Sequence, residues 1–410
     1  MNLLVINQPL CNRGDESAHK ALLRSLCTAL PNARIMVLFI DTYSESSIKQ
    51  FDIHNERVKY KSYKTSDLHK YFFRNCWKWG LHVLWLFNLS SLRILCFYKK
   101  ADWIISAPGG ISMGGFQNWD HLYQLELARF MRKKVAYYGR SFGPFPTSTP
   151  SQRKYKKFSY RLLHYFDYLA IRDKETEKLA DEIGLYYNST VDCAFLESPC
   201  VELPYEVKKA IGDTPYMVFV PNLLIWHYAF KGKVSKEALL DYYSKMLDVM
   251  FEYNPNCNVV MLPQTFDYYT YEWDDVNLFR DIADMKNDSR IVVLPDCYSS
   301  DIQQSIIKKS ILLVGGRYHS IVFSINQAIP FVALSYEHKI KGLLEALNKT
   351  TNMIDITKAF DNIENKENTL IEFEKIIQNV KPDVEAQKKA KKIAQDCFDK
   401  FIARLTGGYE

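Results

Sequence analysis

Short apolar runs alternate with longer amphipathic segments along most of the chain. The short runs suit buried parallel strands, and the segments between them have the hydrophobic spacing of helices with one packed face. In the first half this pattern predicts strands at residues 3–7, 34–40, 103–107, 135–138 and 168–171, with helices at 15–30, 118–132, 151–165 and 174–183. Such alternation is typical of βαβ units that build a parallel sheet.

The pattern restarts after a polar, proline-containing passage at residues 198–215. The second half predicts strands at residues 216–220, 258–262, 291–294, 311–314 and 331–334, with helices at 236–253, 275–283, 300–309 and 338–347. At 410 residues the chain is too long for one ordinary core. We therefore predict an α/β protein with two Rossmann-like domains facing a central cleft, residues 1–200 and 201–383. A Lys-rich C-terminal helix within residues 384–410 is expected to pack back on the first domain.

Composition narrows the class of protein. An apolar content of 47% with 24% charged residues indicates a globular chain, and a net charge of +6 does not by itself indicate a nucleic-acid binder. The nine cysteines are odd in number and lack a Cys-x-x-Cys pair, which predicts reduced thiols in a cytoplasmic protein. The first nine residues lack the basic stretch of a secretory signal, and no window predicts a membrane-spanning helix.

Residues 70–100 form an insertion that is rich in aromatic and basic side chains, including Trp77, Trp79 and Trp85. Tryptophan beside lysine and arginine suits the headgroup layer of an anionic membrane. The alternative is a helix pair whose aromatic side chains simply pack on the sheet. The sequence leaves both interpretations open.

The strongest candidate site is residues 314–320, Val-Gly-Gly-Arg-Tyr-His-Ser. A buried strand ends there in two glycines and a helix follows, which is where open α/β sheets place ligands. Arg317 offers a planar fork for a carboxylate or phosphate, and His319 is a residue type that transfers protons near neutral pH. The segment predicts a small anionic substrate handled by acid–base chemistry. The alternative is a buried histidine and a structural ion pair.

Loops at the predicted strand ends of the first domain carry further candidates. Asn12, Gly14 and Asp15 follow the first strand, and two interpretations of Asp15 stay open: it only caps the next helix, or it has a role in binding a ligand. Gly109 and Gly110 lie in a glycine-rich loop before His121, which either faces the cleft or packs.

Two arginines of the first domain follow predicted strands. Arg140 lies in Gly-x-Ser-x-Gly, which is not read as a nucleophile elbow because Pro144 and Pro146 disfavour the required helix. Arg172 is either an anion ligand or the partner of Asp173 or Glu175.

Several well-known motifs are missing from the sequence. It contains no P-loop, no dinucleotide-binding glycine motif and no His-Glu-x-x-His zinc motif. No Asp-x-Asp stands at a strand end, which weakens the case for a metal-dependent sugar transferase.

Together these motifs resemble the polysaccharide pyruvyl transferase family. The resemblance rests on Asn12-x-Gly14-Asp15, Pro108-Gly109-Gly110, Gly139–Pro144, Arg172-Asp173 and above all Gly316–Ser320, followed by Pro330 and Tyr336-x-x-Lys339. It implies a two-domain GT-B-like fold and transfer of the enolpyruvyl carbons of phosphoenolpyruvate to a sugar, giving a pyruvate ketal, with no metal and no cofactor.

The resemblance also implies roles for individual residues. His319 and Arg317 would be catalytic. The donor would be bound by Arg172, Gly316, Arg317, Tyr318 and Lys339. The acceptor would be bound by Asn12, Gly14, Asp15, Gly109, Gly110, His121 and Arg140.

For the acceptor we predict a hexose, galactose, within a lipid-linked oligosaccharide at the inner face of a bacterial membrane, with the enzyme cytoplasmic and peripherally attached. Two alternatives stay open. One is a GT-B glycosyltransferase that uses a nucleotide sugar, and the other is a non-catalytic, membrane-docked assembly factor for capsule enzymes.

Overall fold

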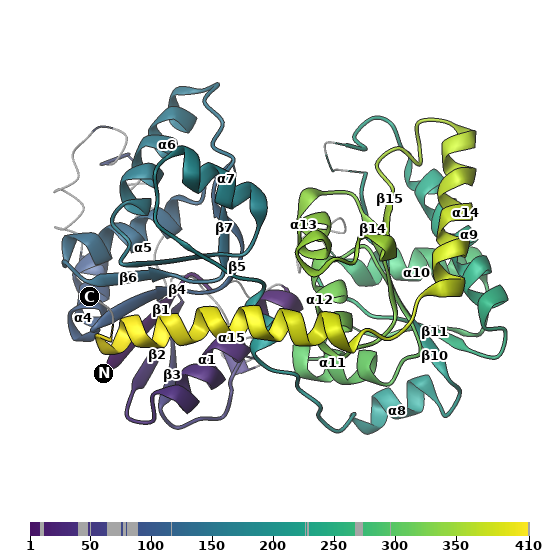
Figure 1. Ribbon diagram of the computed structural model, residues 1–410, viewed down its shortest axis with the longest axis horizontal. Coiled ribbons are helices and arrows are strands. Elements are labelled where there is room, and N and C mark those ends of the chain that lie inside the picture. The colour runs from purple at the N-terminus through teal and green to yellow at the C-terminus, as the bar shows by residue number, and fades with distance from the viewer. Residues whose placement is uncertain are drawn as a thin grey trace. The chain divides into compact units, whose positions relative to one another are not determined.

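The computed structural model describes residues 1–8, 12–39, 48–49, 51–63, 75–76, 79, 89–115, 117–225, 227, 229–266, 274–295 and 297–408. The chain divides into two compact units (Figure 1). Unit 1 comprises Met1–Leu10, Ala18–Leu196 and Ile393–Glu410, and unit 2 comprises Cys11–Ser17 and Glu197–Lys392. The first domain predicted from the sequence is continuous, whereas the structure groups residues 11–17 with unit 2.

Among the described residues, unit 1 is built on a seven-stranded parallel sheet in the order β3-β2-β1-β4-β6-β8-β9. The strands are β1 (Asn2–Ile6), β2 (Arg34–Phe39), β3 (Val58–Ser62), β4 (Trp103–Ser106), β6 (Lys134–Tyr137), β8 (Tyr168–Ile171) and β9 (Asn188–Ser189). A separate pair joins β5 (Gly109–Met113) to β7 (Arg140–Phe142). The order runs outward in both directions from the β1–β4 pair, as in a Rossmann fold.

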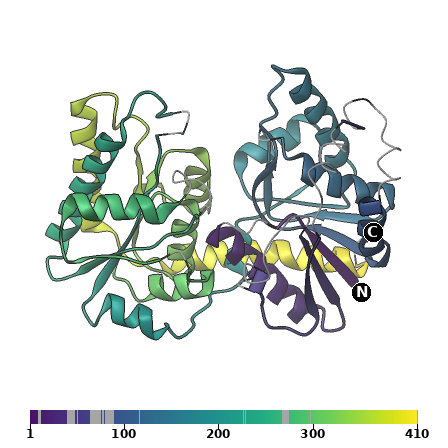
Figure 2. The ribbon, with the colours of Figure 1, turned by 180° about the vertical axis from the view of Figure 1, so that it is seen from behind.

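Helices cover both faces of the unit 1 sheet. They are α1 (Arg13–Ala29), α4 (Leu89–Lys100), α5 (Trp119–Phe130), α6 (Pro150–Leu163), α7 (Lys174–Glu182) and α15 (Val384–Thr406), with the short 3₁₀ helix η2 (Cys193–Leu196). One core contains Leu22 of α1 and Phe401 of α15, and the other contains Leu122 of α5 and Leu162 of α6. The amino end of the chain and the end of α15 belong to unit 1 and lie close together in both views (Figure 2).

Unit 2 repeats this topology. Its described strands form a six-stranded parallel sheet in the order β12-β11-β10-β13-β14-β15. The strands are β10 (Tyr216–Val220), β11 (Asn258–Met261), β12 (Ile291–Val293), β13 (Leu313–Gly315), β14 (Phe331–Ser335) and β15 (Met353–Asp355). The order again reverses at one central pair, here β10 and β13.

The helices of unit 2 pack in groups around this sheet. They are α8 (Tyr205–Ile211), α9 (Lys236–Tyr253), α10 (Asp275–Lys286), α11 (Ser300–Lys308), α12 (Tyr318–Asn326), α13 (His338–Leu347) and α14 (Ile363–Asn379), with the 3₁₀ helix η4 (Thr350–Asn352). Helix α9 contacts α10 and α14, and α11 contacts α12 (Figure 1). The sheet is thereby covered on both faces, as the almost wholly apolar strands β10 and β14 require.

Helix boundaries follow local signals in the sequence. Thr149 and Gln152 form a capping box around Pro150 at the start of α6. Asn287 and Asn348 end α10 and α13 in the left-handed conformation, which asparagine tolerates better than most residues.

The described part of the insertion contributes to the unit 1 core. Ile94 and Tyr98 of α4 are fully buried there, whereas the Trp79 side chain is exposed. Trp77 and Trp85 lie outside the described residues. In the part of the chain that the structure describes, no helix is long and apolar enough to cross a bilayer.

Candidate active site

The carboxyl ends of β10 and β13 lie next to each other at the centre of the unit 2 sheet. The Gly316 N–H donates to the Val220 carbonyl oxygen at 2.8 Å and so extends the strand pairing beyond Gly315. A Cβ atom added to Gly316 would lie 3.6 Å from Asn222 Cβ, so the loops after the two strands are in contact. Strand order reverses here, and a ligand site is expected at this position.

Arg317 is held in place by Asp275, a carboxylate that the sequence analysis did not assign. The guanidinium donates to Asp275 Oδ1 in an ion pair whose carboxylate is buried. The second carboxylate oxygen accepts the backbone N–H of Gln264 at 3.0 Å and of Thr265 at 2.9 Å. Burial alone would lower the pKa of Arg317, but the charge and hydrogen bond of Asp275, together with Tyr336 and Tyr243, outweigh burial and the pKa is raised. The group therefore stays cationic, with 16% of its side chain exposed.

His319 lies in the first turn of α12 and packs against the first turn of α1. Its ring makes an edge contact with the Tyr318 ring, with 5.0 Å between the centroids. A Cβ atom added to Gly14 would lie 1.8 Å from His319 Cγ and 1.9 Å from Nδ1. No side chain fits between the helix backbone and the imidazole, so glycine at position 14 is what allows this contact.

Asn12 caps α1. Its Oδ1 accepts the N–H of Gly14 at 2.7 Å and of Asp15 at 3.2 Å. The prediction that Asp15 caps this helix is wrong, because the helix begins at Arg13 and Asp15 already lies inside it. Asn12, Gly14 and Asp15 also group with unit 2, not with the first domain to which the sequence analysis assigned them.

Two amides follow neighbouring strands of this sheet, Asn222 after β10 and Gln264 after β11. Gln264 is buried, and within the described part of the chain neither polar atom of its side chain has a hydrogen-bond partner. Asn222 donates to the Tyr336 hydroxyl at 2.7 Å, while its Oδ1 finds no partner among the described residues. Leaving a buried polar group unpaired costs roughly 1–3 kcal/mol, so these atoms are suited to receive a polar ligand.

Tyr336 and Lys339 follow β14. Burial raises the pKa of the Tyr336 hydroxyl, so this group is a neutral hydrogen-bond donor and acceptor. The Lys339 ammonium lies 3.5 Å from Glu337 Oε1. The donor-binding roles of Gly316, Tyr318 and Lys339 stay predictions.

The predicted role of His121 in acceptor binding is contradicted by its surroundings. Its ring is fully buried, and its nitrogens lie 3.0 Å from Ser106 Oγ and 2.8 Å from Ser112 Oγ. Burial, helped by the Arg140 charge, holds the pKa of this imidazole well below its usual range. His121 is therefore a neutral residue of the unit 1 core, because a ring that is buried and bonded at both nitrogens cannot contact a sugar.

Three other acceptor candidates lie in the β5–β7 region of unit 1. Arg140 is buried, and its Nη1 donates to the Asn7 carbonyl oxygen at 3.3 Å. Gly109 has φ of +147°, which favours glycine, whereas a Cβ atom added to Gly110 would meet nothing within 4 Å. The conformation thus explains Gly109, and acceptor binding by these residues stays a prediction.

Arg172 forms a buried ion pair with Asp192, which in turn accepts the Ala194 N–H at 3.0 Å. The alternative prediction was that Arg172 pairs with a neighbour in the sequence, Asp173 or Glu175. Asp173 instead caps α7 by accepting the Thr176 N–H at 2.9 Å. Arg172 belongs to unit 1 and Arg317 to unit 2, so a shared role in donor binding stays a prediction.

Within the described residues, no cluster of three or more His, Cys, Asp or Glu side chains could hold a metal ion. The prediction that the protein needs no metal stays untested.

Comparison with solved structures defines the class of fold. The chain is similar to UDP-GlcNAc 2-epimerase from Methanocaldococcus jannaschii, with 11% identity and a TM-score of 0.61 over 98% of this chain and 99% of that one. It is similar to the Neisseria meningitidis UDP-GlcNAc 2-epimerase, with 11% identity and a TM-score of 0.57 over 98% of this chain and 100% of that one. These likenesses, together with the two doubly wound parallel sheets, confirm the predicted two-domain GT-B-like fold.

The family follows from the sequence match. Residues 12–338 match the polysaccharide pyruvyl transferase family, and the chain belongs to it. The chain is also 22% identical over 307 residues to the amylovoran biosynthesis protein AmsJ of Erwinia amylovora. This match covers 71% of this chain and 70% of AmsJ. The resemblance drawn from the motifs is thereby confirmed.

Proposed function

We propose that this protein transfers the enolpyruvyl group of phosphoenolpyruvate to a galactose residue of a bacterial exopolysaccharide precursor and closes it to a pyruvate ketal. Family membership supports the transferase class. The observation that carries the proposal is the position of the Arg317 guanidinium. Arg317 lies two positions before His319, where the strand order reverses, and the buried Asp275 carboxylate holds it there. The similarity to AmsJ supports a place in exopolysaccharide biosynthesis.

The donor has the charge that this arrangement suits. Phosphoenolpyruvate carries a carboxylate and a phosphate on a three-carbon frame, and a guanidinium binds either group through two parallel hydrogen bonds. The amides of Gln264 and Asn222 would bind its remaining oxygen atoms. Asp275 accepts hydrogen bonds from Arg317 and from two backbone N–H groups, so it fixes the cation before the substrate arrives.

The proposed reaction starts with protonation of the donor methylene carbon by His319, which leaves an oxocarbenium-like C2. One sugar hydroxyl adds to C2, its proton returning to the imidazole. The C2–O bond to phosphate then breaks, and a neighbouring hydroxyl forms the second C–O bond. Its proton leaves with the hydrogen phosphate, so the two hydroxyl protons end on the new methyl group and on phosphate. Arg317 would stabilise the departing phosphate, because a preorganised charge acts strongly away from water.

Two of the residues predicted to bind the acceptor have structural roles. Asn12 is occupied as a helix cap, and Gly14 provides the surface on which His319 packs. Acceptor binding by Asp15, whose carboxylate can accept hydrogen bonds from sugar hydroxyls, stays part of the proposal.

The proposal is tested by measuring phosphate release from phosphoenolpyruvate in the presence of a β-galactoside. Replacing His319 with Ala should lower the rate by about 10²–10⁴-fold, the usual contribution of a general acid–base group. Arg317→Ala should lower it by about 10²–10³-fold, as expected when one charge-stabilising donor is removed. The matched control is Arg280→Ala, an exposed arginine of α10, which should keep the wild-type rate.

A nucleotide-sugar glycosyltransferase gives the opposite result. UDP or GDP would then protect the protein against thermal unfolding and phosphoenolpyruvate would not. That outcome, or unchanged phosphate release in both variants, contradicts the proposal.

We further propose that residues 70–100 attach the protein to an anionic membrane surface. The Trp79 side chain is 77% exposed, which supports the idea for the one tryptophan of this segment that is described. Replacing Trp77, Trp79 and Trp85 with Ser should reduce cosedimentation with phosphatidylglycerol vesicles and leave activity on a soluble acceptor intact. Tyr205→Ser, at another exposed aromatic, serves as the control. Equal sedimentation of wild type and triple variant would rule out this role.

A further inference from the structure

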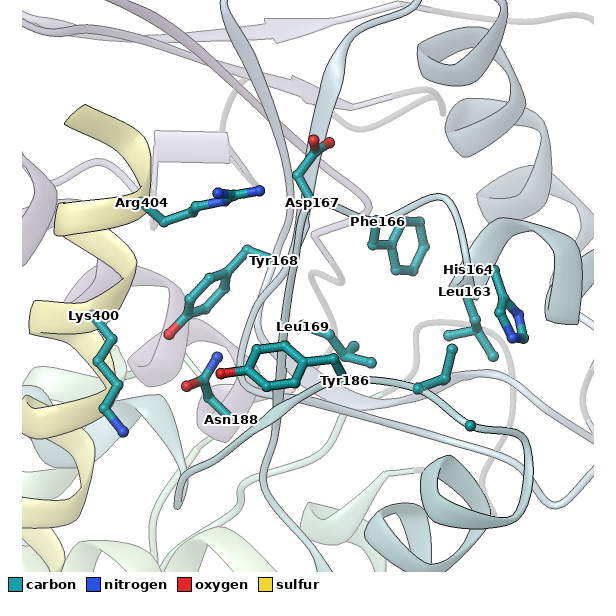
Figure 3. Close-up of a pocket in the computed structure, with 12 residues that line it drawn as sticks. Leu163, His164, Phe166, Asp167, Tyr168, Leu169, Tyr186, Asn188, Lys400 and Arg404 are labelled. Carbon is teal, nitrogen blue, oxygen red and sulfur yellow. The ribbon is translucent and has the colours of Figure 1, made fainter. Parts of the chain in front are cut away.

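Unit 1 contains a cavity of about 560 Å³ at the amino end of β8 (Figure 3). Its walls come from the end of α6, the start of β8, the loop that leads into β9, and the last turns of α15. Parallel strands bring their carboxyl ends to the opposite edge of the sheet, where Arg172 follows β8. The cavity is therefore separate from the strand-end loops that carry the candidate catalytic residues, and its size suits a small ligand.

One side of the cavity carries cationic side chains, and the other is formed by the carboxyl ends of two helices. Lys400 and Arg404 lie one turn apart on α15 and so project from one face of the helix. In Figure 3 they lie on one side, and Leu163 and His164 lie on the other. That second side is formed by the carboxyl ends of α6 and α7, where His164 bridges the carbonyl oxygens of Tyr160 at 2.8 Å and Ile183 at 3.1 Å.

Helix carboxyl ends carry a partial negative charge, so this second wall favours hydrogen-bond donors over anions. Asp167 adds a carboxylate to the lining and is fixed in place by accepting the Val135 N–H at 2.9 Å. A fully anionic ligand such as a nucleotide fits poorly, because among the described lining residues there is no helix amino end to bind its phosphates. A ligand with many hydroxyl groups and one negative charge matches both walls.

Between the two walls lies an aromatic ring that the fold does not bury. Tyr186 is 89% exposed, and in Figure 3 its ring lies between Lys400 and His164, next to Asn188. Tyr168, also in the lining, is buried and donates from its hydroxyl to the Cys397 carbonyl oxygen at 2.9 Å, which joins the start of β8 to α15. The electron-rich face of an exposed tyrosine is suited to stack on the C–H groups of a sugar ring.

We propose that this cavity is a second saccharide site, which binds an acidic sugar unit away from the reacting centre. The sugar ring stacks on Tyr186, its carboxylate pairs with Lys400, and its hydroxyls bond to Asn188 and Asp167. Such a site gives a polysaccharide-modifying enzyme a second contact with its chain and raises the effective concentration of the acceptor. The inference does not rest on the identity of the donor.

The test is isothermal titration calorimetry of the full chain with two disaccharides that differ only in one carboxylate, cellobiouronic acid and cellobiose. The acid should bind at one site, and cellobiose at least about tenfold more weakly, because it lacks the carboxylate that pairs with Lys400. Tyr186→Ser and Lys400→Gln should each weaken binding of the acid about tenfold or more. The matched controls, Tyr205→Ser and Lys392→Gln, replace exposed side chains outside the cavity and should bind as the wild type does.

Arg317→Ala separates this cavity from the candidate active site. Binding of the acid that survives Arg317→Ala and is weakened by Tyr186→Ser supports the proposal. The absence of binding at millimolar sugar overturns it, as does equal affinity for cellobiose, unchanged affinity in Tyr186→Ser, or loss of binding in Arg317→Ala. Far-ultraviolet circular dichroism of each variant shows whether a loss of binding comes from unfolding.

Discussion

At the scale of single residues, the site depends on how Asp275 presents Arg317. One carboxylate oxygen pairs with the guanidinium, and the other accepts two backbone N–H groups from the loop after β11. Because every partner of this carboxylate is a donor, it cannot rotate away without losing several hydrogen bonds. The arginine is thereby fixed, and only part of its surface is left for a ligand.

Asp275→Asn tests this positioning role. The amide keeps the volume of the side chain but loses the charge, and its NH₂ group cannot accept a hydrogen bond from a guanidinium. We expect the KM for phosphoenolpyruvate to rise about tenfold or more, while the KM for the galactoside changes little. Steady-state kinetics with each substrate varied in turn measures both values.

Asp288→Asn is the matched control, since it breaks another Asp–Arg pair of unit 2, with Arg290, outside the strand-end loops. If Asp275→Asn and Asp288→Asn gave the same KM for phosphoenolpyruvate, Asp275 would have no positioning role.

At the scale of elements, the first turn of α1 completes the unit 2 site. The Arg13 N–H donates to the Gln264 carbonyl oxygen at 2.9 Å, and the Arg13 guanidinium pairs with Glu16 at 2.9 Å while lying over the Phe266 ring. Glu16 also accepts the backbone N–H of Ser300 at 3.0 Å, at the amino end of α11. A carboxylate at a helix amino end is favoured by the helix dipole, so this contact ties α1 to α11.

Gly14→Ala tests the packing of α1 on α12. Alanine is the better helix former by about 1 kcal/mol, but its methyl group would lie 1.8 Å from His319 Cγ. The imidazole must move, so we expect activity to fall on the order of 100-fold and the free energy of unfolding to fall by roughly 1–3 kcal/mol. Urea denaturation and phosphate release measure the two effects.

Gly342→Ala is its control, because that glycine lies inside α13 and an added methyl group there meets nothing within 4 Å. The control should be neutral or slightly stabilising. Wild-type activity in Gly14→Ala would mean that His319 does not need this contact.

At the scale of the whole molecule, the two units have the same strand order, and each buries polar side chains of its own. Unit 1 buries the imidazole rings of His19 and His121. Burial, with a smaller contribution from Lys20, lowers the pKa of His19 to about 3. Between that value and about 6.5, the usual pKa of an unfolded histidine, the unfolded chain binds a proton that the folded chain does not. Stability contributed by neutral His19 is therefore complete above pH 6.5 and is lost as the pH falls.

His19→Leu should remove this dependence. Each unit of pH below 6.5 costs the folded state about 1.4 kcal/mol for such a histidine, so between pH 7 and pH 5 the effect is about 2 kcal/mol. We expect the loss of unfolding free energy over this range to be smaller by about that amount in the variant, as measured by urea denaturation at both pH values.

His338→Leu replaces an exposed histidine and should behave as the wild type does. A wild-type pH dependence in His19→Leu would show that His19 titrates normally in the folded protein.

A structural feature can be predicted from the sequence when the residues that form it lie close together along the chain. Strand runs such as residues 216–220 and the turn at Gly316 are local features, and the structure has them where the pattern predicts them. The β15 strand and the α14 helix were not predicted, because the first is short and the second carries an exposed, charged face with few buried positions. His121 looked like a site residue because neither Ser106 nor Ser112 marks itself in the sequence as its partner.

The sequence alone determined the α/β class, the two Rossmann-like halves, the family, and the strand end that carries Arg317 and His319, since all of these depend on local hydrophobic pattern and short motifs. Only the tertiary structure decided which side chains are buried and which groups pair. It joined Arg317 to Asp275, Arg172 to Asp192, and His319 to Gly14. Such pairings are set when strand order brings distant loops together, and no local pattern encodes them.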